Sequence, residues 1–494
     1  MLDSHLLSWL IAWPLIAFVL LWGWPYPHQT RIVAPVAALV ELLLAVIAVA
    51  MVRPDQTGFQ LEEQLDWIPS LNVYYHLGID GLSAPFLPLT ALLFLAVTLV
   101  SWNWVQKLQP FYFALLLLLE GLIVGIFTAL DTVLFFLFWE MTLVPIYFLI
   151  SLYGVGPQRR LAAIQYTLWM LAGGVALLAG LVWLALYHPQ GPTFDLTQLL
   201  SQSRSQPHDL TTVQLPVFLL LLVGFAVKVP LFPFHGWLPL VAMEGPIALS
   251  ATLVGLKLGV YGLIRMAIPL APQAAQQLHW LLAGLGLVGV VYGALLSLVQ
   301  SNLRQLLAFA SISHVGLVVL ALFSFNMEGL QGALLQLFNF TLISSMLFIL
   351  AGVIHHRVGS NDWIHLGGLA RPMPATSTLL LLFGMASLSL PLTSGFPAEQ
   401  LLLLAVLQSH TGAALAALGG QILAAAAFIH YYRRACFGPL NSSLATISVD
   451  LYRHEQWIIG LFWALVMAGG LIPSALVDWM RPSAQAWLAG VITP

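Results

Sequence analysis

Three ionisable side chains lie inside apolar stretches of the sequence. Glu140 is in the stretch 135–143, Lys228 in 223–230 and Lys257 in 253–259. A charge at the centre of a membrane helix destabilises the inserted helix by at least about 2.5 kcal/mol, so such residues point by default to a function. Burial disfavours a charged lysine, and a nearby carboxylate favours it. A carboxylate that moves or gains a proton would therefore make a neighbouring lysine release its own.

Glu140 and Lys228 are the pair that we expect to act in this way, provided that two helices bring them together. A structural ion pair, or side chains that reach the membrane surface, would also explain these charges. Lys257 is flanked by Gly255 and Gly259, which would face away from it on a continuous helix. We expect that helix to pack tightly through its glycines and to turn Lys257 towards a polar interior.

Proline residues interrupt two of the apolar stretches. The interruptions read KVPLFPFH at 228–235 and LPLTSGFPAE at 390–399. Proline within a helix frees carbonyl groups, which is tolerated at membrane depth where the backbone lies inside the protein or lines a cavity. Paired interruptions in two halves of a chain indicate inverted repeats around a transport path. Lys228 and Glu399 place one ionisable group at each, although simple proline kinks are the alternative.

His314 lies between the two interruptions, in the string SISHVG at 311–316. Histidine titrates near neutrality and could relay protons, and the flanking serines would keep a hydrated path open. A hydrogen bond to a neighbouring helix is the equally simple explanation.

The composition determines where these residues must lie. Of the 494 residues, 60% are hydrophobic and only 7% are charged, against roughly a quarter charged in a soluble domain. A soluble enzyme and a disordered chain are both excluded. The net charge of −3 offers no basic surface for nucleic acid, and the single cysteine forms no internal disulfide. We expect an all-α integral membrane protein.

A bilayer core requires about 20 apolar residues per helix. We expect about fourteen transmembrane helices, at residues 6–24, 33–52, 83–104, 111–130, 132–153, 161–187, 215–235, 246–268, 276–299, 303–324, 329–353, 373–405, 411–437 and 456–478. No Lys or Arg precedes the first of these, so it is expected to be a retained span rather than a cleaved signal. The residue pattern of 53–82 has the alternation expected of the strands of a short hairpin lying on the membrane. Residues 188–212 are expected to form a loop outside the membrane.

The distribution of lysine and arginine predicts how the chain is oriented in the membrane. Ten of them fall in loops opposite the termini and four on the terminal side, and Lys228 and Lys257 lie inside spans. Because positive charge concentrates in cytoplasmic loops, both termini are expected on the non-cytoplasmic side.

Several strings together resemble the M-type antiporter-like subunit of respiratory complex I, the NuoM/NdhD family. They are WIP at 67–69, LGIDGLS at 77–83, FWEMTLVP at 138–145, the stretch 228–239, KLGVYGLIR at 257–265, SISHVG at 311–316, LGGL at 366–369 and SGF at 394–396. The resemblance covers residues 60–440 and implies two inverted five-helix repeats, each with one broken helix. It implies an essential acid at Glu140, central lysines at Lys228 and Lys257 and an output acid at Glu399. It also places His235 and His314 on the polar axis.

The chain departs from the family pattern at four places. Leu240-Val241-Ala242 replaces Asp-Ala-His, Gln165 replaces a lysine, Phe340 a histidine, and Asn302-Leu303-Arg304 replaces Asp-Leu-Lys. These departures weaken the expected input route and part of the central relay. They indicate a divergent paralogue, for which the cyanobacterial complexes of carbon dioxide uptake are one candidate.

The leading hypothesis is a proton-translocating membrane-arm subunit of a complex-I-like NAD(P)H or ferredoxin:quinone oxidoreductase, in a bacterial plasma membrane or a cyanobacterial thylakoid. Other membrane-arm subunits and the bilayer are the expected partners. Redox energy would come from them, because the sequence has no dinucleotide, phosphate or iron–sulfur motif, and we expect no cofactor in this chain. The alternatives are a subunit of a multisubunit cation/proton antiporter and a spacer that has lost pumping. The expected regions are 1–110 with the hairpin, repeats at 111–268 and 276–437, and a C-terminal helix within 438–494.

Overall fold

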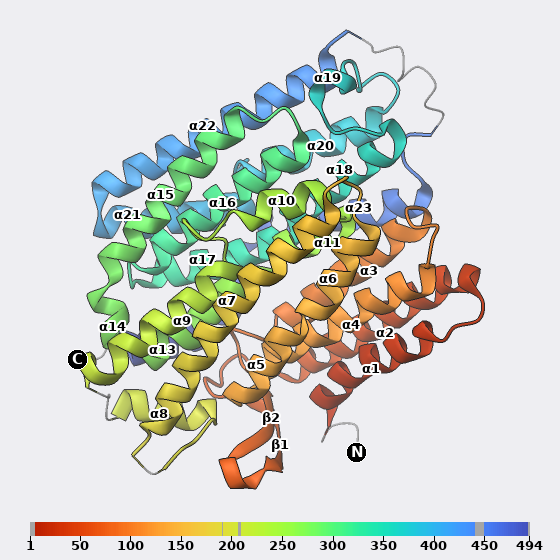
Figure 1. Ribbon diagram of the computed structural model, residues 1–494. Coiled ribbons are helices and arrows are strands. Elements are labelled where there is room, and N and C mark those ends of the chain that lie inside the picture. The colour runs from red at the N-terminus through yellow and green to blue at the C-terminus, as the bar shows by residue number, and fades with distance from the viewer. Residues whose placement is uncertain (1–4, 190, 206–208, 440–448, 493–494) are drawn as a thin grey trace.

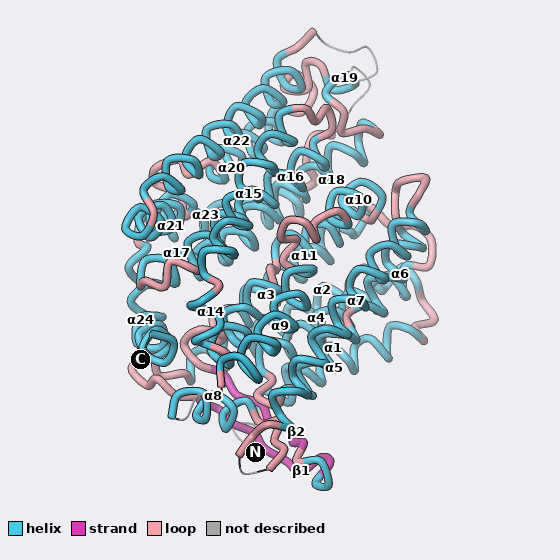
Figure 2. Tube along the Cα trace, turned by 60° about the vertical axis from the view of Figure 1, so that its left-hand side comes forward, coloured by secondary structure: helices cyan, strands magenta, loops and turns pink. Residues whose placement is uncertain are grey.

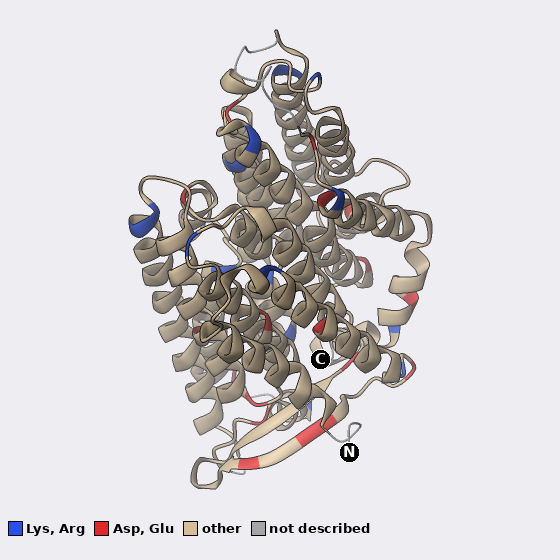
Figure 3. Cartoon of the chain, turned by 90° about the vertical axis from the view of Figure 1, so that its right-hand side faces the viewer, with Lys and Arg blue, Asp and Glu red and all other residues tan. Residues whose placement is uncertain are grey.

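The computed structural model describes residues 5–189, 191–205, 209–439 and 449–492. They form a bundle of helices with one small sheet at one end (Figure 1). The start of α1 and the end of α24 lie at this same end, with the sheet and α8 (Figures 1 and 2). We refer to it as the hairpin end. Charged residues are sparse along the helices, and acidic residues mark the sheet (Figure 3).

The N-terminal part contains α1, α2, a two-stranded antiparallel sheet and α3. The bounds are α1 Leu6–Trp22, α2 Pro27–Met51, β1 Gln60–Ile68, β2 Val73–Ile79 and α3 Phe86–Val100. In the sheet, Gln64 pairs with His76 and Asp66 with Tyr74. The hairpin predicted between residues 53 and 82 is therefore confirmed.

The next helices contain the first interruption. The bounds are α4 Gln109–Thr128, α5 Thr132–Met141, α6 Leu143–Tyr153, α7 Arg159–Leu186, α8 Leu196–Ser205, α9 Leu215–Lys228 and α10 Trp237–Glu244. The chain is non-helical between Lys228 and Trp237, as the prolines predicted. The segment 188–212 was expected to be a loop, but it contains the short helix α8; residues 190 and 206–208 of that loop lie outside the described residues.

The remaining helices complete the bundle. Their bounds are α11 Ile247–Gly255, α12 Leu258–Gly262, α13 Ile268–Leu270, α14 Pro272–Gln277, α15 His279–Leu298, α16 Leu303–Leu322, α17 Met327–Asn339, α18 Ser345–Val358, α19 Trp363–Leu366, α20 Pro374–Ser387, α21 Gly395–Ser409, α22 Thr411–Phe437, α23 Arg453–Leu471 and α24 Pro473–Ile492. The second predicted interruption separates α20 from α21. Short π-helical turns at Leu263–Ala267 and Phe340–Ser344 lie next to α12 and α18.

The membrane-spanning character of the chain follows from the length of these helices. Within the described residues, eleven helical segments are long and apolar enough to cross a membrane, and the bent pair α23–α24 would make a twelfth. Helices α1 and α20 are apolar but shorter. The all-α, multi-pass membrane fold is therefore confirmed, whereas the count of fourteen spans is not.

The C-terminal region differs from the single helix expected within 438–494. Two helices, α23 and α24, meet there at 72°. The bend falls just before Pro473, which has no backbone N–H to continue the hydrogen bonding of α23 and therefore begins a new helix instead.

Close helix packing relies on glycine where α15 crosses α16. A Cβ atom added at Gly316 would lie 2.6 Å from the carbonyl oxygen of Gly286 and 2.7 Å from the backbone nitrogen of Val290. Small residues allow the backbones of membrane helices to approach in this way. This contact fixes α16, the helix that carries His314.

Candidate functional site

Glu140 and Lys228 lie at the ends of two helices that both pack on α7. Glu140 is near the C-terminal end of α5 and is half-buried. Its carboxylate lies against Gly174 of α7, where any added Cβ would collide with it. Lys228 is the last residue of α9, at the start of the first interruption. The helix break therefore places the lysine beside the carboxylate-bearing helix.

The ammonium of Lys228 contacts Trp139 and Thr142, which lie one residue before and two residues after Glu140. Its Nζ donates to Thr142 Oγ1 at 3.1 Å and to the carbonyl oxygen of Trp139 at 3.5 Å. It also lies 3.9 Å from the centroid of the Trp139 ring, a cation–π contact. Among the ion pairs of the described residues, none joins Lys228 to Glu140. The predicted pair is thus brought together, with Thr142 and Trp139 holding the lysine.

A small cavity extends from Lys228 towards the next candidate residue. Its volume is about 20 Å³, and roughly 10–15 Å³ suffices for one water molecule. Lys228, Thr142 and the buried Tyr166 supply polar groups to its wall, and the Tyr166 hydroxyl has no hydrogen-bond partner in the described structure. Leu256 and Leu258, the sequence neighbours of Lys257, also line it. The cavity therefore ends beside the residues that flank Lys257.

Lys257 lies in a third interruption that the sequence analysis did not predict. The helix stops at Gly255 and restarts at Leu258, with Lys257 between them at φ −85° and ψ 61°. The expectation of a continuous helix was therefore wrong. Two glycines within five residues weaken a helix, and Gly259 is pressed against the backbone of α9, where an added Cβ would lie 2.6 Å from the nitrogen of Val229.

The side chain of Lys257 is buried and points to α16. Its Nζ donates to Ser311 Oγ at 2.7 Å and lies 5.2 Å from the centroid of the Phe340 ring. His314 follows Ser311 by three residues, so the two side chains lie on the same face of α16. His314 is buried, and its Nε2 has no partner within the described structure. Lys257, Ser311 and His314 thus form one polar cluster.

His235 lies beyond the first interruption, next to α15. Its ring stacks on Phe232 at a centroid distance of 5.6 Å and meets Tyr292 edge-on at 5.0 Å. The side chain is 8% exposed, and its Nδ1 has no partner among the described residues. The structure therefore places His235 apart from the cluster of Lys257 and His314, on the α15 side of the break.

Glu399 is the fifth residue of α21, shortly after the second interruption. Its carboxylate accepts a hydrogen bond from the hydroxyl of Ser389, which lies in the connection between α20 and α21. At both breaks, side chains donate hydrogen bonds to backbone carbonyl groups at the break. Such hydrogen bonds are needed because no water is available to these groups inside the membrane. Trp237 Nε1 donates to the carbonyl oxygen of Val227 at 2.8 Å, and Asn339 Nδ2 donates to that of Ser394 at 3.0 Å.

Two further buried carboxylates were missed by the sequence analysis. Glu41 in α2 and Glu120 in α4 are both 0% exposed. None of their four carboxylate oxygens has a hydrogen-bond partner in the described structure. Glu120 follows the apolar run 113–119, so the reasoning that identified Glu140 applies to it as well.

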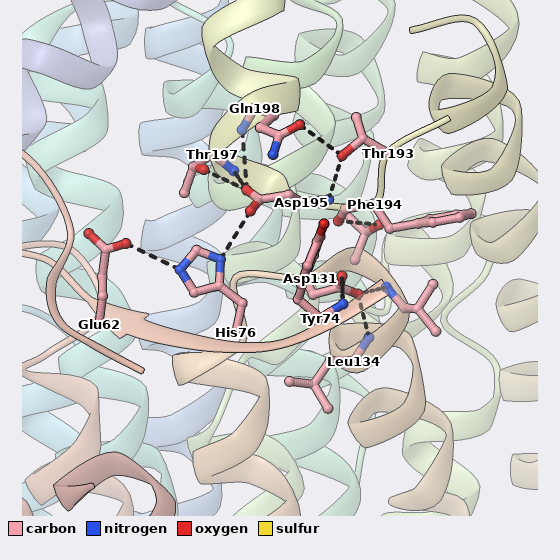
Figure 4. A network of polar contacts seen from close by, with 12 residues as sticks. Glu62, Tyr74, His76, Asp131, Leu134, Thr193, Phe194, Asp195, Thr197 and Gln198 are labelled. Atoms are coloured by element: carbon pink, nitrogen blue, oxygen red, sulfur yellow. Dashed lines mark hydrogen bonds and ion pairs between the residues drawn. The ribbon is translucent and has the colours of Figure 1, made fainter. Parts of the chain in front are cut away.

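A polar network at the hairpin end also escaped the sequence analysis (Figure 4). His76 of β2 lies between two carboxylates, with Nδ1 3.2 Å from Asp195 and Nε2 3.2 Å from Glu62. Asp131 caps α5 by accepting from the backbone nitrogens of Val133 and Leu134, and it also accepts from that of Tyr74 at 3.0 Å. We call Glu62, His76, Asp131 and Asp195 the hairpin clamp, because they tie the sheet to the start of the helix that carries Glu140.

The clamp has shifted proton affinities. Burial disfavours the charged form of His76, but the hydrogen bonds and charges of Asp195 and Glu62 outweigh it and raise the pKa of His76 above 6.5. Burial raises the pKa of Asp131 to about 6, despite its hydrogen bonds from the backbone. Asp195 is also buried, yet its hydrogen bonds with His76 and Thr197 hold its pKa below 3.8.

Comparisons with known proteins agree with this arrangement. The family model described as "NADH:quinone oxidoreductase/Mrp antiporter, TM" matches residues 129–424. NADH-quinone oxidoreductase subunit M of Rhodobacter capsulatus is 36% identical over 92% of this chain and 90% of its own length. NAD(P)H-quinone oxidoreductase chain 4 1 of Synechococcus elongatus is 37% identical over 85% of this chain and 79% of its own.

Solved structures show the same fold. A chain of respiratory complex I from Thermus thermophilus with bound NADH has a TM-score of 0.89 at 30% identity, with 99% of this chain and 100% of that chain covered. A chain of the Mrp complex from Dietzia sp. DQ12-45-1b has a TM-score of 0.83 at 23% identity, with 97% and 52% covered. The chain therefore belongs to the NADH:quinone oxidoreductase/Mrp antiporter family of membrane proteins, and within it to the subunit M group.

Proposed function

We propose that this chain is a proton-translocating membrane-arm subunit of a complex-I-like quinone oxidoreductase. The observation that carries the proposal is the row of polar groups between the two main broken helices. It runs from Lys228 through the small cavity to the flanks of Lys257, and then through Ser311 to His314. Buried ionisable groups in such a row are the usual elements of a proton relay in a membrane protein.

Glu140 would control the proton on Lys228. A charged Glu140 stabilises the charged form of Lys228. When the carboxylate is protonated or moves away, the buried lysine loses this stabilisation and its neutral form is favoured. Lys228 would then release its proton towards the cavity, where the Tyr166 hydroxyl lies. Thr142 and Trp139 keep the ammonium in place through this change.

Lys257 and His314 would pass the proton into the second half, with Glu399 as the output acid. The Ser389 hydroxyl, which lies in the second break, donates a hydrogen bond to the Glu399 carboxylate. A conformational change at the break would therefore alter this hydrogen bond. The role of His235 in this scheme is proton exchange near the first break. These roles follow from the position and chemistry of the residues, and each can be tested by substituting the residue.

Electron transfer would occur in other subunits of the assembly. The Rhodobacter capsulatus relative is a subunit of an NADH-quinone oxidoreductase and the Synechococcus elongatus relative a chain of an NAD(P)H-quinone oxidoreductase. We propose that this chain binds no cofactor and partners other membrane-arm subunits, with both termini on the non-cytoplasmic side. The two relatives are 36% and 37% identical to it, so we propose a bacterial plasma membrane or a cyanobacterial thylakoid as its location, and a complex of carbon dioxide uptake as one candidate assembly.

A subunit of a multisubunit cation/proton antiporter is the second candidate. It is favoured by the family description, which includes the Mrp antiporter, and by the shared fold. Purification of the tagged chain from its native membrane separates the two functions. Co-purification with quinone-reductase and iron–sulfur subunits would support the proposal. Recovery with small antiporter subunits and no redox centres would refute it.

Substitution of the first pair tests the proton path itself. Glu140→Gln and Lys228→Ala should abolish proton uptake in membrane vesicles energised by the quinone reductase, because each removes a proton-binding group from the row. Lys107→Ala is the matched control, since this lysine is exposed and should leave uptake unchanged. Wild-type uptake in either of the first two variants, with the assembly intact, would contradict the scheme.

A further inference from the structure

Glu41 and Glu120 carry carboxyl groups that the proposed proton row does not use. Glu41 lies in the middle part of α2 and Glu120 in the middle part of α4, and both helices are long and apolar enough to cross a membrane. Helix α2 packs on α4, and the two side chains are close enough for their charges to act on each other. The structure therefore brings two carboxyl groups together at membrane depth.

The surroundings of Glu41 keep its carboxyl group away from lipid. Leu39 and Leu43, about half a turn from Glu41 on either side, are exposed, as expected where a helix faces lipid. The other buried residues along this part of α2 are alanines and one proline: Ala34, Pro35, Ala37, Ala38, Ala45 and Ala48. Such small residues allow membrane helices to approach closely. With an exposed fraction of 0%, Glu41 therefore lies inside the helix contact rather than at the membrane surface.

Neither carboxyl group has a partner that would stabilise its charge. None of the four carboxylate oxygens accepts a hydrogen bond within the described structure. Among the ion pairs of the described residues, none involves Glu41 or Glu120. A buried carboxylate without such a partner binds a proton instead of staying charged, and two neighbouring carboxylates also repel each other. The pair therefore carries at least one proton.

Helix α1 contacts both helices next to the pair. Trp13 Nε1 donates to the carbonyl oxygen of Ala37 at 2.9 Å, one turn before Glu41. Pro14 packs on Gly121, where an added Cβ would lie 3.2 Å from the Cβ of the proline. Because Pro14 lies inside α1 and has no backbone N–H, the carbonyl group four residues before it lacks its helical donor. A protonated carboxyl group can donate a hydrogen bond, and α1 places an acceptor in need of one near the pair.

Helix α4 links the pair to the cavity beside Lys228. Leu119 and Ile123 of α4 line that cavity. At about 100° per residue, both lie on the same side of Glu120, within roughly 100° of it around the helix axis. The pair and the Lys228 cavity therefore lie on adjoining faces of one helix, with two aliphatic side chains between them.

We propose that Glu41 and Glu120 form a second proton-binding site, which exchanges protons with the Lys228 cavity past Leu119 and Ile123. This inference rests on the proposed function and deepens it. At rest the pair would hold one proton between its two carboxyl groups, and after taking up another it would hold two. The pair would thus store a proton beside the first half of the row.

The exchange consists of proton transfers alone. The ammonium of Lys228 would give a proton to water in the cavity, which leaves a neutral lysine, and the water would pass a proton to the carboxylate of the pair. The reverse transfer returns it. The charges of the lysine and the pair cancel before the transfer, and both are absent after it. The exchange therefore adds no net charge at membrane depth, where charge is strongly disfavoured.

Infrared difference spectroscopy of the native assembly in membranes, between the resting state and quinone-reductase turnover, tests the exchange. In the wild type, turnover should increase absorbance in the carbonyl stretching region of protonated carboxylic acids. This band should shift in heavy water and with glutamate that is isotope-labelled at its carboxyl carbon. The double variant Glu41→Gln/Glu120→Gln should lose a component of the band, and it should assemble because glutamine has the same size and is neutral. Asp55→Asn is the matched control, because this carboxyl group is exposed just after α2, and it should keep the whole band.

Proton uptake by the same membranes separates this inference from the proposed function. Identical difference spectra in the wild type and the double variant, while wild-type vesicles take up protons, would overturn the inference and leave the proposed function in place. Absence of quinone-reductase-driven uptake in the wild type would refute the proposed function and the exchange with it.

The single variants Glu41→Gln and Glu120→Gln provide the test if the double variant does not assemble. In each of them the remaining acid is buried without a charged neighbour and stays protonated throughout, so the component should again be lost. Persistence of the component in both single variants would overturn the inference.

Discussion

Lys257 depends on a single hydroxyl for the placement of its charge. Ser311 Oγ is the hydrogen-bond acceptor of its ammonium within the described structure, and the rest of its surroundings include the Phe340 ring. A buried ammonium that loses its partner is strongly disfavoured, because water cannot replace the lost contact. At the residue scale, Ser311 is therefore a positioning residue for Lys257.

Ser311→Ala should slow proton uptake, because it removes this acceptor and disfavours the charged lysine by about 1–3 kcal/mol. Ser311→Thr keeps the hydroxyl and should restore most of the uptake. The matched control is Ser313→Ala on the same helix, since that hydroxyl donates to the carbonyl oxygen of Val290 at 2.9 Å and does not contact the lysine. Equal uptake in Ser311→Ala and Ser313→Ala vesicles would show that the hydroxyl does not position Lys257.

Helix packing determines whether these residues stay aligned. The contact of α15 with α16 relies on the absence of a side chain at Gly316, whereas Gly284 on α15 has open space around it. Gly316→Ala should therefore destabilise the protein by about 1–3 kcal/mol. Gly284→Ala should be neutral or stabilising by up to about 1 kcal/mol, from helix propensity alone. Thermal unfolding of the two variants checks this, and equal unfolding temperatures would contradict the close contact.

The hairpin clamp couples a second element, the sheet, to α5. The raised pKa of His76 means that its pairing with the carboxylates stabilises the fold fully below pH 6.5 and is lost as the pH rises through the higher folded value. The raised pKa of Asp131, about 6, acts in the same direction. Asp195 has a lowered pKa, so its contribution is present above pH 3.8 and is lost as the pH falls further. The clamp should be strongest in mildly acidic solution.

Amide hydrogen exchange of β1 and β2 tests this pH dependence, after correction for the intrinsic exchange rate. Protection should be greater near pH 5.5 than near pH 8, because His76 is then fully charged. His76→Gln should remove most of the difference. His430→Gln, on the exposed side of α22, should leave it unchanged. Protection that does not vary with pH in the wild type would contradict the clamp.

At the scale of the whole molecule, regular periodicity made much of the fold predictable. The hairpin and both proline interruptions follow from turn and breaker residues that act locally, and Glu140, Lys228 and Glu399 stand out because charge is rare in apolar runs. The third break at Lys257 was not predictable in this way. It depends on the contact of Gly259 with the backbone of α9, which is a tertiary contact.

Other features of the site likewise depend on contacts between distant segments. The approach of Lys228 to Thr142 and Trp139 joins residues 86 and 89 positions apart, and the clamp joins His76 to Asp195 across 119 positions. The bend between α23 and α24 was missed although Pro473 could have indicated it. Glu120 was missed although its apolar setting resembles that of Glu140.

The central claim is that one path links the two halves through Lys257. Proton uptake driven by the quinone reductase, measured in sealed membrane vesicles for Lys257→Met and for the exposed control Lys107→Ala, tests it most directly. We predict that Lys257→Met abolishes proton uptake although the assembly stays intact. The Lys107→Ala control should keep wild-type uptake. Wild-type uptake per electron in Lys257→Met would contradict the account, because protons would then cross without the residue that joins the two halves.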